Sequence, residues 1–156
     1  MNLRTVLGTA LFAICALAVA ACGGGGSTYN APTPGPTCAP GENVQIVYPI
    51  PGATGVPDAT AQIVVAVASP LPGWNIWFQS SSTYSPYAGY YSGAFSTIGP
   101  SQVPTPAATP QIANPVYQSA SLGNGSFGSG VNVYLWLNNG NSNCTPLGPL
   151  GSFTTQ

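Results

Sequence analysis

Charged side chains are almost missing from this chain of 156 residues, which holds one Lys or Arg, two Asp or Glu and no His. The charged fraction is 2%, against about 25% in an ordinary soluble domain. Arg4 is the single basic residue, and Glu42 and Asp58 are the two acids. Without basic side chains to neutralise phosphate, neither nucleic acid nor a nucleotide is an expected partner.

The same shortage limits catalysis. General acid–base chemistry usually needs a histidine, a lysine or a pair of carboxylates, and only Glu42 and Asp58 could form such a pair. Serines are plentiful, but the sequence has no His or Lys to activate one. We therefore predict that the protein is not an enzyme and that it uses no metal or cofactor. Turn formation or solvation is the simpler role for the two carboxylates.

The N-terminal apolar stretch is too short for a membrane-spanning helix, which takes about 20 apolar residues. Arg4 followed by the stretch from Val6 to Ala18 has instead the pattern of a secretory signal peptide. Its closing residues, Val19-Ala-Ala-Cys22, resemble the lipobox of bacterial lipoproteins. That resemblance implies removal of residues 1–21, diacylation of Cys22 and stable anchoring through more than one acyl chain. Ordinary signal cleavage is the alternative.

Residues 22–41 are rich first in glycine and then in proline, which is typical of a linker. We expect this tether to hold the following domain away from a membrane. Gly23 directly after the cysteine is similar to the outer-membrane-sorted class of lipoproteins, so an outer membrane or cell surface is the expected location. An envelope protein or a glycan is the partner to expect there.

Two cysteines remain once the signal peptide and the lipidated residue are set aside. Cys38 and Cys144 would meet in an exported, oxidising setting, where a disulfide is the natural interpretation. The bond would close a loop of about 100 residues and contribute up to ~4.7 kcal/mol in the chain-entropy model. A metal site is the alternative, but further ligands are lacking.

Short β patterns separated by Gly, Pro and Asn clusters fill the chain from Glu42 onward, with no amphipathic helical window. About seven short strands in a segment of this length predict one all-β immunoglobulin-like sandwich over residues 42–156. The proline-rich segment 100–115 is expected to be a surface connection or an irregular edge. The predicted strands are 44–48, 61–68, 74–79, a weak one near 90–97, 116–122, 131–138 and 152–155.

Both ends of this segment resemble bacterial Ig-like domains. The run from Val47 to Asp58, Val-Tyr-Pro-Ile-Pro-Gly-Ala-Thr-Gly-Val-Pro-Asp, is similar to their kinked first strand, and an apolar second strand follows. Gly151-Ser-Phe-Thr-Thr is similar to their final strand. The sequence departs from the family in lacking a Tyr at the start of the penultimate strand. The resemblance implies an immunoglobulin-like fold and a structural or binding role.

Aromatic residues are the strongest candidates for a binding function. Strand alternation in 74–79 and 131–138 places Trp77, Tyr134 and Trp136 together on an outer sheet face, where we expect them to meet solvent. They could stabilise the sheet as cross-strand pairs, with a loop folded over them. They could instead form a flat platform that stacks on sugar rings or docks a partner.

A second candidate is the segment from Ser80 to Ser96, where tyrosines occur among serines and glycines. This composition is found in adaptable recognition loops, because tyrosine supplies contact area at low entropic cost. It is also what an uncharged hydrophilic loop looks like, so a passive loop is the alternative. The candidate binding tyrosines are Tyr84, Tyr87, Tyr90 and Tyr91.

Overall fold

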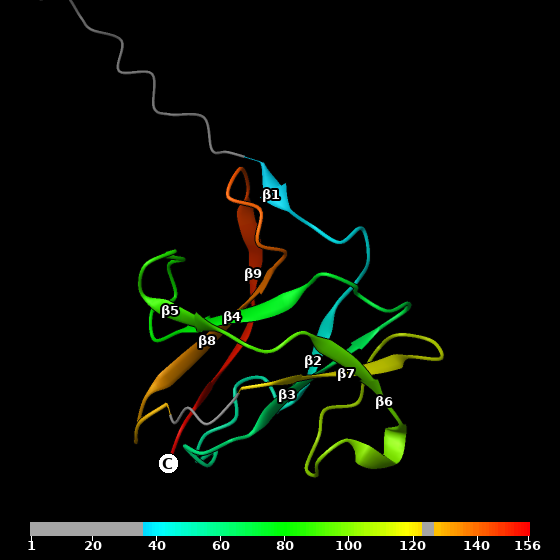
Figure 1. Ribbon diagram of the computed structural model, residues 1–156. Coiled ribbons are helices and arrows are strands. Elements are labelled where there is room, and N and C mark those ends of the chain that lie inside the picture. Colours follow the sequence, from blue (N-terminus) through cyan, green and yellow to red (C-terminus); the bar gives the residue numbers. More distant parts are fainter. Residues whose placement is uncertain (1–35, 123–126) are drawn as a thin grey trace, which may run out of the picture. The chain divides into compact units, whose positions relative to one another are not determined.

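The computed structural model describes residues 36–122 and 127–156, which form a sandwich of two β-sheets (Figure 1). One sheet has the strand order β1-β9-β8-β4-β5, and the other has β2-β3-β7-β6. The predicted all-β class is confirmed, and the described residues contain no helix long and apolar enough to cross a membrane. The elements are β1 Thr37–Cys38, β2 Gln45–Tyr48, β3 Gln62–Val67, β4 Asn75–Gln79, β5 Gly89–Tyr91, β6 Phe95–Ile98, the short 3₁₀ turn η1 Pro100–Gln102, β7 Val116–Ser121, β8 Asn132–Asn138 and β9 Thr145–Thr154.

The strand order is that of an immunoglobulin-like sandwich. Strands β2, β3, β7 and β6 occupy the places of the A, B, E and D strands, and β4, β8 and β9 occupy those of C, F and G. β5 extends the second sheet beside β4, and β1 adds a short parallel strand beside β9. The predicted fold class is therefore correct in both composition and topology.

The core between the sheets follows from the alternation of apolar residues along the strands. On β8, Val133, Leu135 and Leu137 point inward and are buried, as their spacing predicts. β3 is buried on both faces, which explains its uninterrupted run of β-branched and small residues. The buried core comprises Ile46, Val56, Ile63, Val65, Val67, Leu71, Ile76, Phe78, Ala120, Leu122, Val133, Leu135, Leu137 and Phe153.

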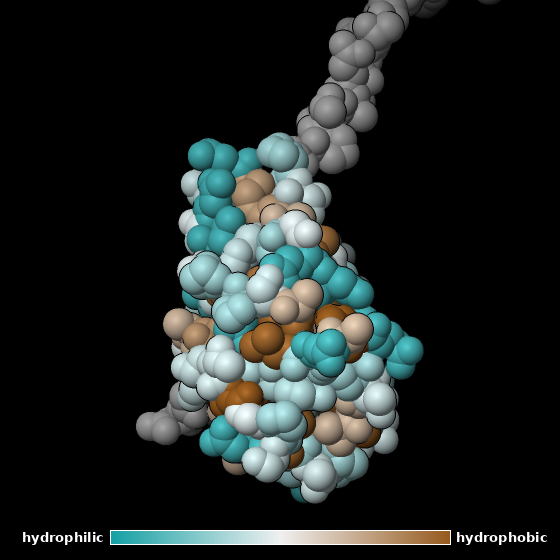
Figure 2. All heavy atoms as spheres, turned by 90° about the vertical axis from the view of Figure 1, so that its right-hand side faces the viewer, coloured by the Kyte–Doolittle hydropathy of each residue, from teal (hydrophilic) through white to brown (hydrophobic). Residues whose placement is uncertain are grey.

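The proline-rich segment covers the outer face of the four-stranded sheet. Val103 and Ile112 pack on a second small cluster that includes Val64, while the Ala108 N–H donates a hydrogen bond to the Val47 carbonyl (2.8 Å). This bond occupies one of the acceptors along the edge strand β2, which reduces its capacity to pair with another chain. Figure 2, which views the molecule from the right of Figure 1, shows hydrophobic residues as separated groups among paler ones.

Two strand predictions need correction. The predicted strand near 90–97 is two strands in different sheets, β5 and β6, and the chain crosses between the sheets at Ser92 and Gly93. The Ser92 N–H donates to the carbonyl of Ile76 in one sheet (2.8 Å). The Gly93 N–H donates to the carbonyl of Ser121 in the other sheet (2.7 Å). β9 begins seven residues before the predicted start at Ser152, because Pro146 and Pro149 are accommodated at an irregular edge where the register with β8 shifts.

The N-terminal boundary also differs from the prediction. Thr37 and Cys38 pair with Thr145 and Pro146 in a short parallel ladder. The end of the predicted tether is therefore part of the sheet, which a strand of two residues could not signal in advance. The signal peptide, Cys22 and the rest of the tether lie outside the described residues.

Candidate functional site

The predicted aromatic platform lies on the outer face of the five-stranded sheet, but it is covered. Trp77 of β4 and Trp136 of β8 are direct cross-strand partners, as alternation predicts. Their side chains are only 4% and 2% exposed, so the expectation that they meet solvent is wrong. Tyr134 is half-buried, with its ring centroid 6.2 Å from that of Trp136. The three residues form a covered cross-strand cluster, which corresponds to the stabilising alternative.

The cover is the connection between β4 and β5, residues 80–88, which folds back over the sheet. Its Tyr84 ring lies 6.2 Å from Trp77 and 6.1 Å from Trp136, between centroids. Tyr91, on the returning strand β5, lies 4.6 Å from Trp77 in an edge-on arrangement. Such edge and tilted contacts add about 0.5–1.5 kcal/mol per pair beyond the area that they bury. We call residues 80–91 the tyrosine loop.

Gln79 holds the tyrosine loop in place from below. Its buried Oε1 accepts hydrogen bonds from Trp77 Nε1 and from the Ser85 N–H, both at 3.0 Å. Its Nε2 donates to the carbonyls of Ser81, at 2.9 Å, and Thr83. Alternation along β4 puts Gln79 on the same outer face as Trp77, yet Gln79 is buried, because the loop returns over it.

A cleft of about 500 Å³ opens where the tyrosine loop meets the turn between β8 and β9. We call residues 138–144 of that connection the asparagine turn. Tyr87, at 95% exposure, and Tyr91, at 52%, stand on one side together with the half-buried Tyr84. The described residues that line the cleft are Tyr84, Pro86, Tyr87, Tyr91, Asn138, Gly140, Asn141, Ser142, Asn143, Cys144 and Thr145.

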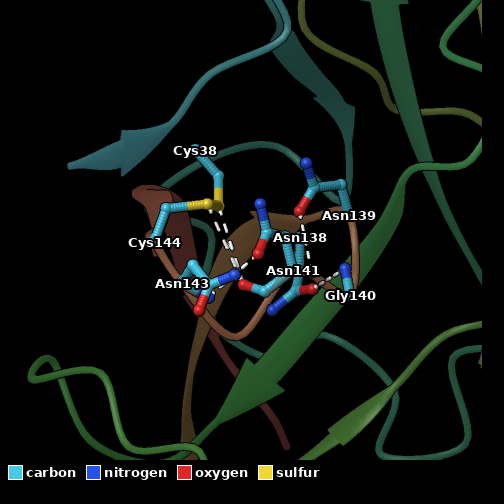
Figure 3. The surroundings of a disulfide bond; sticks show 7 residues. All are labelled: Cys38, Asn138, Asn139, Gly140, Asn141, Asn143 and Cys144. Atoms are coloured by element: carbon cyan, nitrogen blue, oxygen red, sulfur yellow. Dashed lines mark hydrogen bonds between the residues drawn. A yellow bond between two sulfur atoms is a disulfide. The ribbon is translucent and has the colours of Figure 1, made fainter.

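The asparagine turn is built from successive side-chain turns and is fixed by the disulfide (Figure 3). Oδ1 of Asn139 accepts from the Asn141 N–H (3.0 Å), and Oδ1 of Asn141 accepts from the Asn143 N–H (2.9 Å). The predicted bond between Cys38 and Cys144 is confirmed, with Cα atoms 5.3 Å apart. One wall of the cleft is therefore joined covalently to β1.

The cleft is electrically neutral along its described lining. Burial raises the pKa of Tyr84, the neighbouring Tyr91 adds to that rise, and a hydrogen bond with Asn138 opposes it. Tyr84 is therefore a neutral phenol at ordinary pH. Glu42 is bound to Ser69 instead, and neither it nor Asp58 lines the cleft.

Tyr90 lies on the opposite face of β5 from Tyr91, because neighbouring residues on a strand face opposite sides. It is 72% exposed and stacks on Phe78, with centroids 5.8 Å apart. There it lines a different hollow of about 650 Å³, which it shares with Leu122, Phe127 and Val131. The structure thus brings together three of the four tyrosines named from the sequence.

The asparagine turn is the part of the site that sequence reasoning did not single out. Asn138 lies on the outer face of β8 by alternation but is buried, and Asn141 and Asn143 lie beyond the strand pattern. The available signal was the run Asn-Asn-Gly-Asn-Ser-Asn immediately before Cys144, a cysteine already expected to be bonded. Comparison with protein-family models, with curated proteins and with solved structures finds no match to this chain.

Proposed function

We propose that this protein is an exported lipoprotein, anchored to the cell envelope through acylated Cys22, whose immunoglobulin-like domain is a non-catalytic recognition module. The observation that carries the recognition role is the cleft between the tyrosine loop and the asparagine turn. It combines exposed aromatic surface with amide and hydroxyl groups on a wall fixed by a disulfide. Concave sites of this mixed composition are typical of ligand binding.

The two carboxylates support a non-catalytic role. Glu42 is held by both the N–H and the hydroxyl of Ser69, and Asp58 does not line either of the two described hollows. Neither carboxyl is thus placed to exchange a proton with a bound molecule. A purely structural envelope module is the second candidate, and the covered Trp77 and Trp136 favour it for that part of the sheet.

The anchor is tested by expressing the full chain and Cys22→Ser in a bacterial host supplied with radiolabelled palmitate. We expect label in the envelope fraction for the natural chain and none for the variant. Cys15→Ser, which changes a cysteine inside the predicted signal peptide, is the matched control and should be labelled normally. Equal labelling of Cys22→Ser would contradict the anchor.

The recognition role is tested with purified full chain in detergent, added to isolated envelopes. Retention should be lower for Tyr87→Ala than for the natural protein; the Tyr87 side chain is 95% exposed, so we expect its removal to leave the fold intact. Tyr90→Ala removes an exposed tyrosine from the opposite side of the same strand region and should be retained normally. Equal retention of all three proteins would contradict recognition at the cleft and leave the structural role.

A further inference from the structure

The chemistry of the cleft specifies a class of ligand, and this step rests on the proposed recognition role. We infer that the cleft between the tyrosine loop and the asparagine turn binds a neutral saccharide. The sugar ring would stack on the exposed tyrosine faces, and its hydroxyl groups would bond to the asparagine amides.

Charge excludes ionic ligands. The described lining of the cleft includes no acidic or basic side chain, and the only ionisable groups in it are phenols. An ion that enters such a site loses hydration without gaining an opposite charge, which is strongly unfavourable. Phosphorylated, sulfated, carboxylated and amino-bearing ligands are therefore disfavoured. A neutral polar molecule carries no such penalty.

The asparagine turn offers amide N–H donors at the cleft. The hydrogen bonds that shape the turn use the Oδ1 atoms of Asn138, Asn139 and Asn141. With the oxygens engaged, the Nδ2 group of Asn141 retains two N–H donors on the lining of the cleft. Hydroxyl oxygens are suitable acceptors for these donors, and a saccharide offers several on one ring.

The tyrosines supply a surface for the apolar face of a sugar. Tyr87 is almost fully exposed and Tyr91 is half exposed, whereas Tyr84 is held between the two tryptophans below. An exposed tyrosine has an apolar ring and a polar hydroxyl, which matches a pyranose with C–H groups on its face and O–H groups on its rim. Rigid support from below lowers the entropic cost of ordering the loop on binding.

The binding test uses the full chain in detergent and linear neutral oligosaccharides of glucose, mannose and N-acetylglucosamine, with titration calorimetry as the readout. Polygalacturonate and a tyrosine-rich peptide serve as charged and peptide probes. We expect at least one neutral oligosaccharide to bind with an affinity unaffected by added salt, because no ion pair contributes. Binding of only the charged polymer, of only the peptide, or of none of the probes overturns the inference.

Four variants locate the contacts. Tyr87→Ala should weaken saccharide binding about tenfold, whereas Tyr87→Phe keeps the ring and should retain most of the affinity. Asn141→Asp preserves the Oδ1 acceptor that shapes the turn but removes the two Nδ2 donors, so we expect a similar loss. Asn139→Asp introduces the same charge two residues away, at a side chain that does not line the cleft, and should bind normally. Equal effects of the two Asp substitutions would overturn the assigned donor role.

The outcomes separate this inference from the function on which it rests. Retention on envelopes that depends on Tyr87, without binding of any neutral oligosaccharide, would leave the recognition role and reject the saccharide. Loss of that dependence would reject the recognition role itself. Circular dichroism of each variant confirms that the β-sandwich is preserved before either comparison is made.

Discussion

Gln79 accepts the indole N–H of Trp77, two residues earlier on the same strand, and both side chains lie beneath the tyrosine loop. The carboxamide therefore joins the outer face of the sheet to the loop that covers it. Without this bond the indole N–H would be buried with no acceptor, which is unfavourable. Burial of the tryptophans thus depends on a polar residue.

Replacing Gln79 should free the tyrosine loop from the sheet. Gln79→Leu removes bonds to Trp77, Ser85 and the two loop carbonyls, so we expect a loss of about 2–4 kcal/mol in the free energy of unfolding. Urea unfolding measures the loss, and acrylamide quenching of tryptophan fluorescence should rise as the loop opens. Gln111→Ala, at an exposed glutamine, is the control and should change neither quantity. Unchanged quenching in Gln79→Leu would contradict the role of Gln79 in holding the tyrosine loop.

Gly89 is the tightest point of the tyrosine loop. A Cβ built there would lie 2.6 Å from both the Phe78 carbonyl oxygen and Cε2 of Trp77. Gly89→Ala should therefore destabilise the domain by about 1–3 kcal/mol through overpacking. Gly93→Ala is the matched control, since the nearest atom to its Cβ would be 3.6 Å away. Similar urea midpoints for the two variants would show that the loop adjusts freely.

Removing the disulfide should also destabilise the domain. The bond between Cys38 and Cys144 spans 106 positions, and the chain-entropy model gives about 4.7 kcal/mol for a loop of about 100 residues. We expect the double variant Cys38→Ser, Cys144→Ser to lose about 2–5 kcal/mol in the free energy of unfolding. Its urea midpoint should be lower accordingly. Reductant should lower the midpoint of the natural protein but not that of the variant. An equal urea midpoint of the natural protein with and without reductant would contradict this account.

Stability should depend on pH mainly in the acidic range. Hydrogen bonds from Ser69 hold the pKa of Glu42 below the ordinary value of 4.5. The folded state then binds fewer protons than the unfolded chain, so the contribution is complete above 4.5 and is lost as pH falls through the folded pKa. Urea midpoints measured against pH should decline below that value for the natural protein. Glu42→Gln should reduce the decline, and an equal decline in that variant would contradict this account.

The sequence was sufficient to predict the sandwich because the number of short strand patterns and the alternation within them agree on it. The alternation that puts Val133, Leu135 and Leu137 inward also fixes which residues of β8 face outward. The disulfide was predicted by counting the cysteines that remain once Cys15 is assigned to the expected signal peptide and Cys22 to lipidation. These features depend on local periodicity or on counting, and both are visible in a single chain.

The state of the aromatic face was not visible in the same way. Alternation assigns Trp77 and Trp136 to a sheet face, but it carries no information about what else lies on that face. Their burial depends on a loop whose return is set by Gln79 and by the close approach at Gly89, which are contacts over short spans without a periodic signal. Strand β1 was missed for a related reason, since two residues are too few to show alternation.

The disulfide also determines how the domain would respond to a pulling force. β1 is the first strand after the N-terminal segment, and its Cys38 is bonded to the residue just before β9. A pull on the chain ahead of Thr37 therefore reaches a covalent bond before it reaches the core. The residues between the two cysteines cannot be drawn out while that bond is intact, so most of the sandwich is protected from extension. The disulfide thus limits how far the domain can be extended from its N-terminal side.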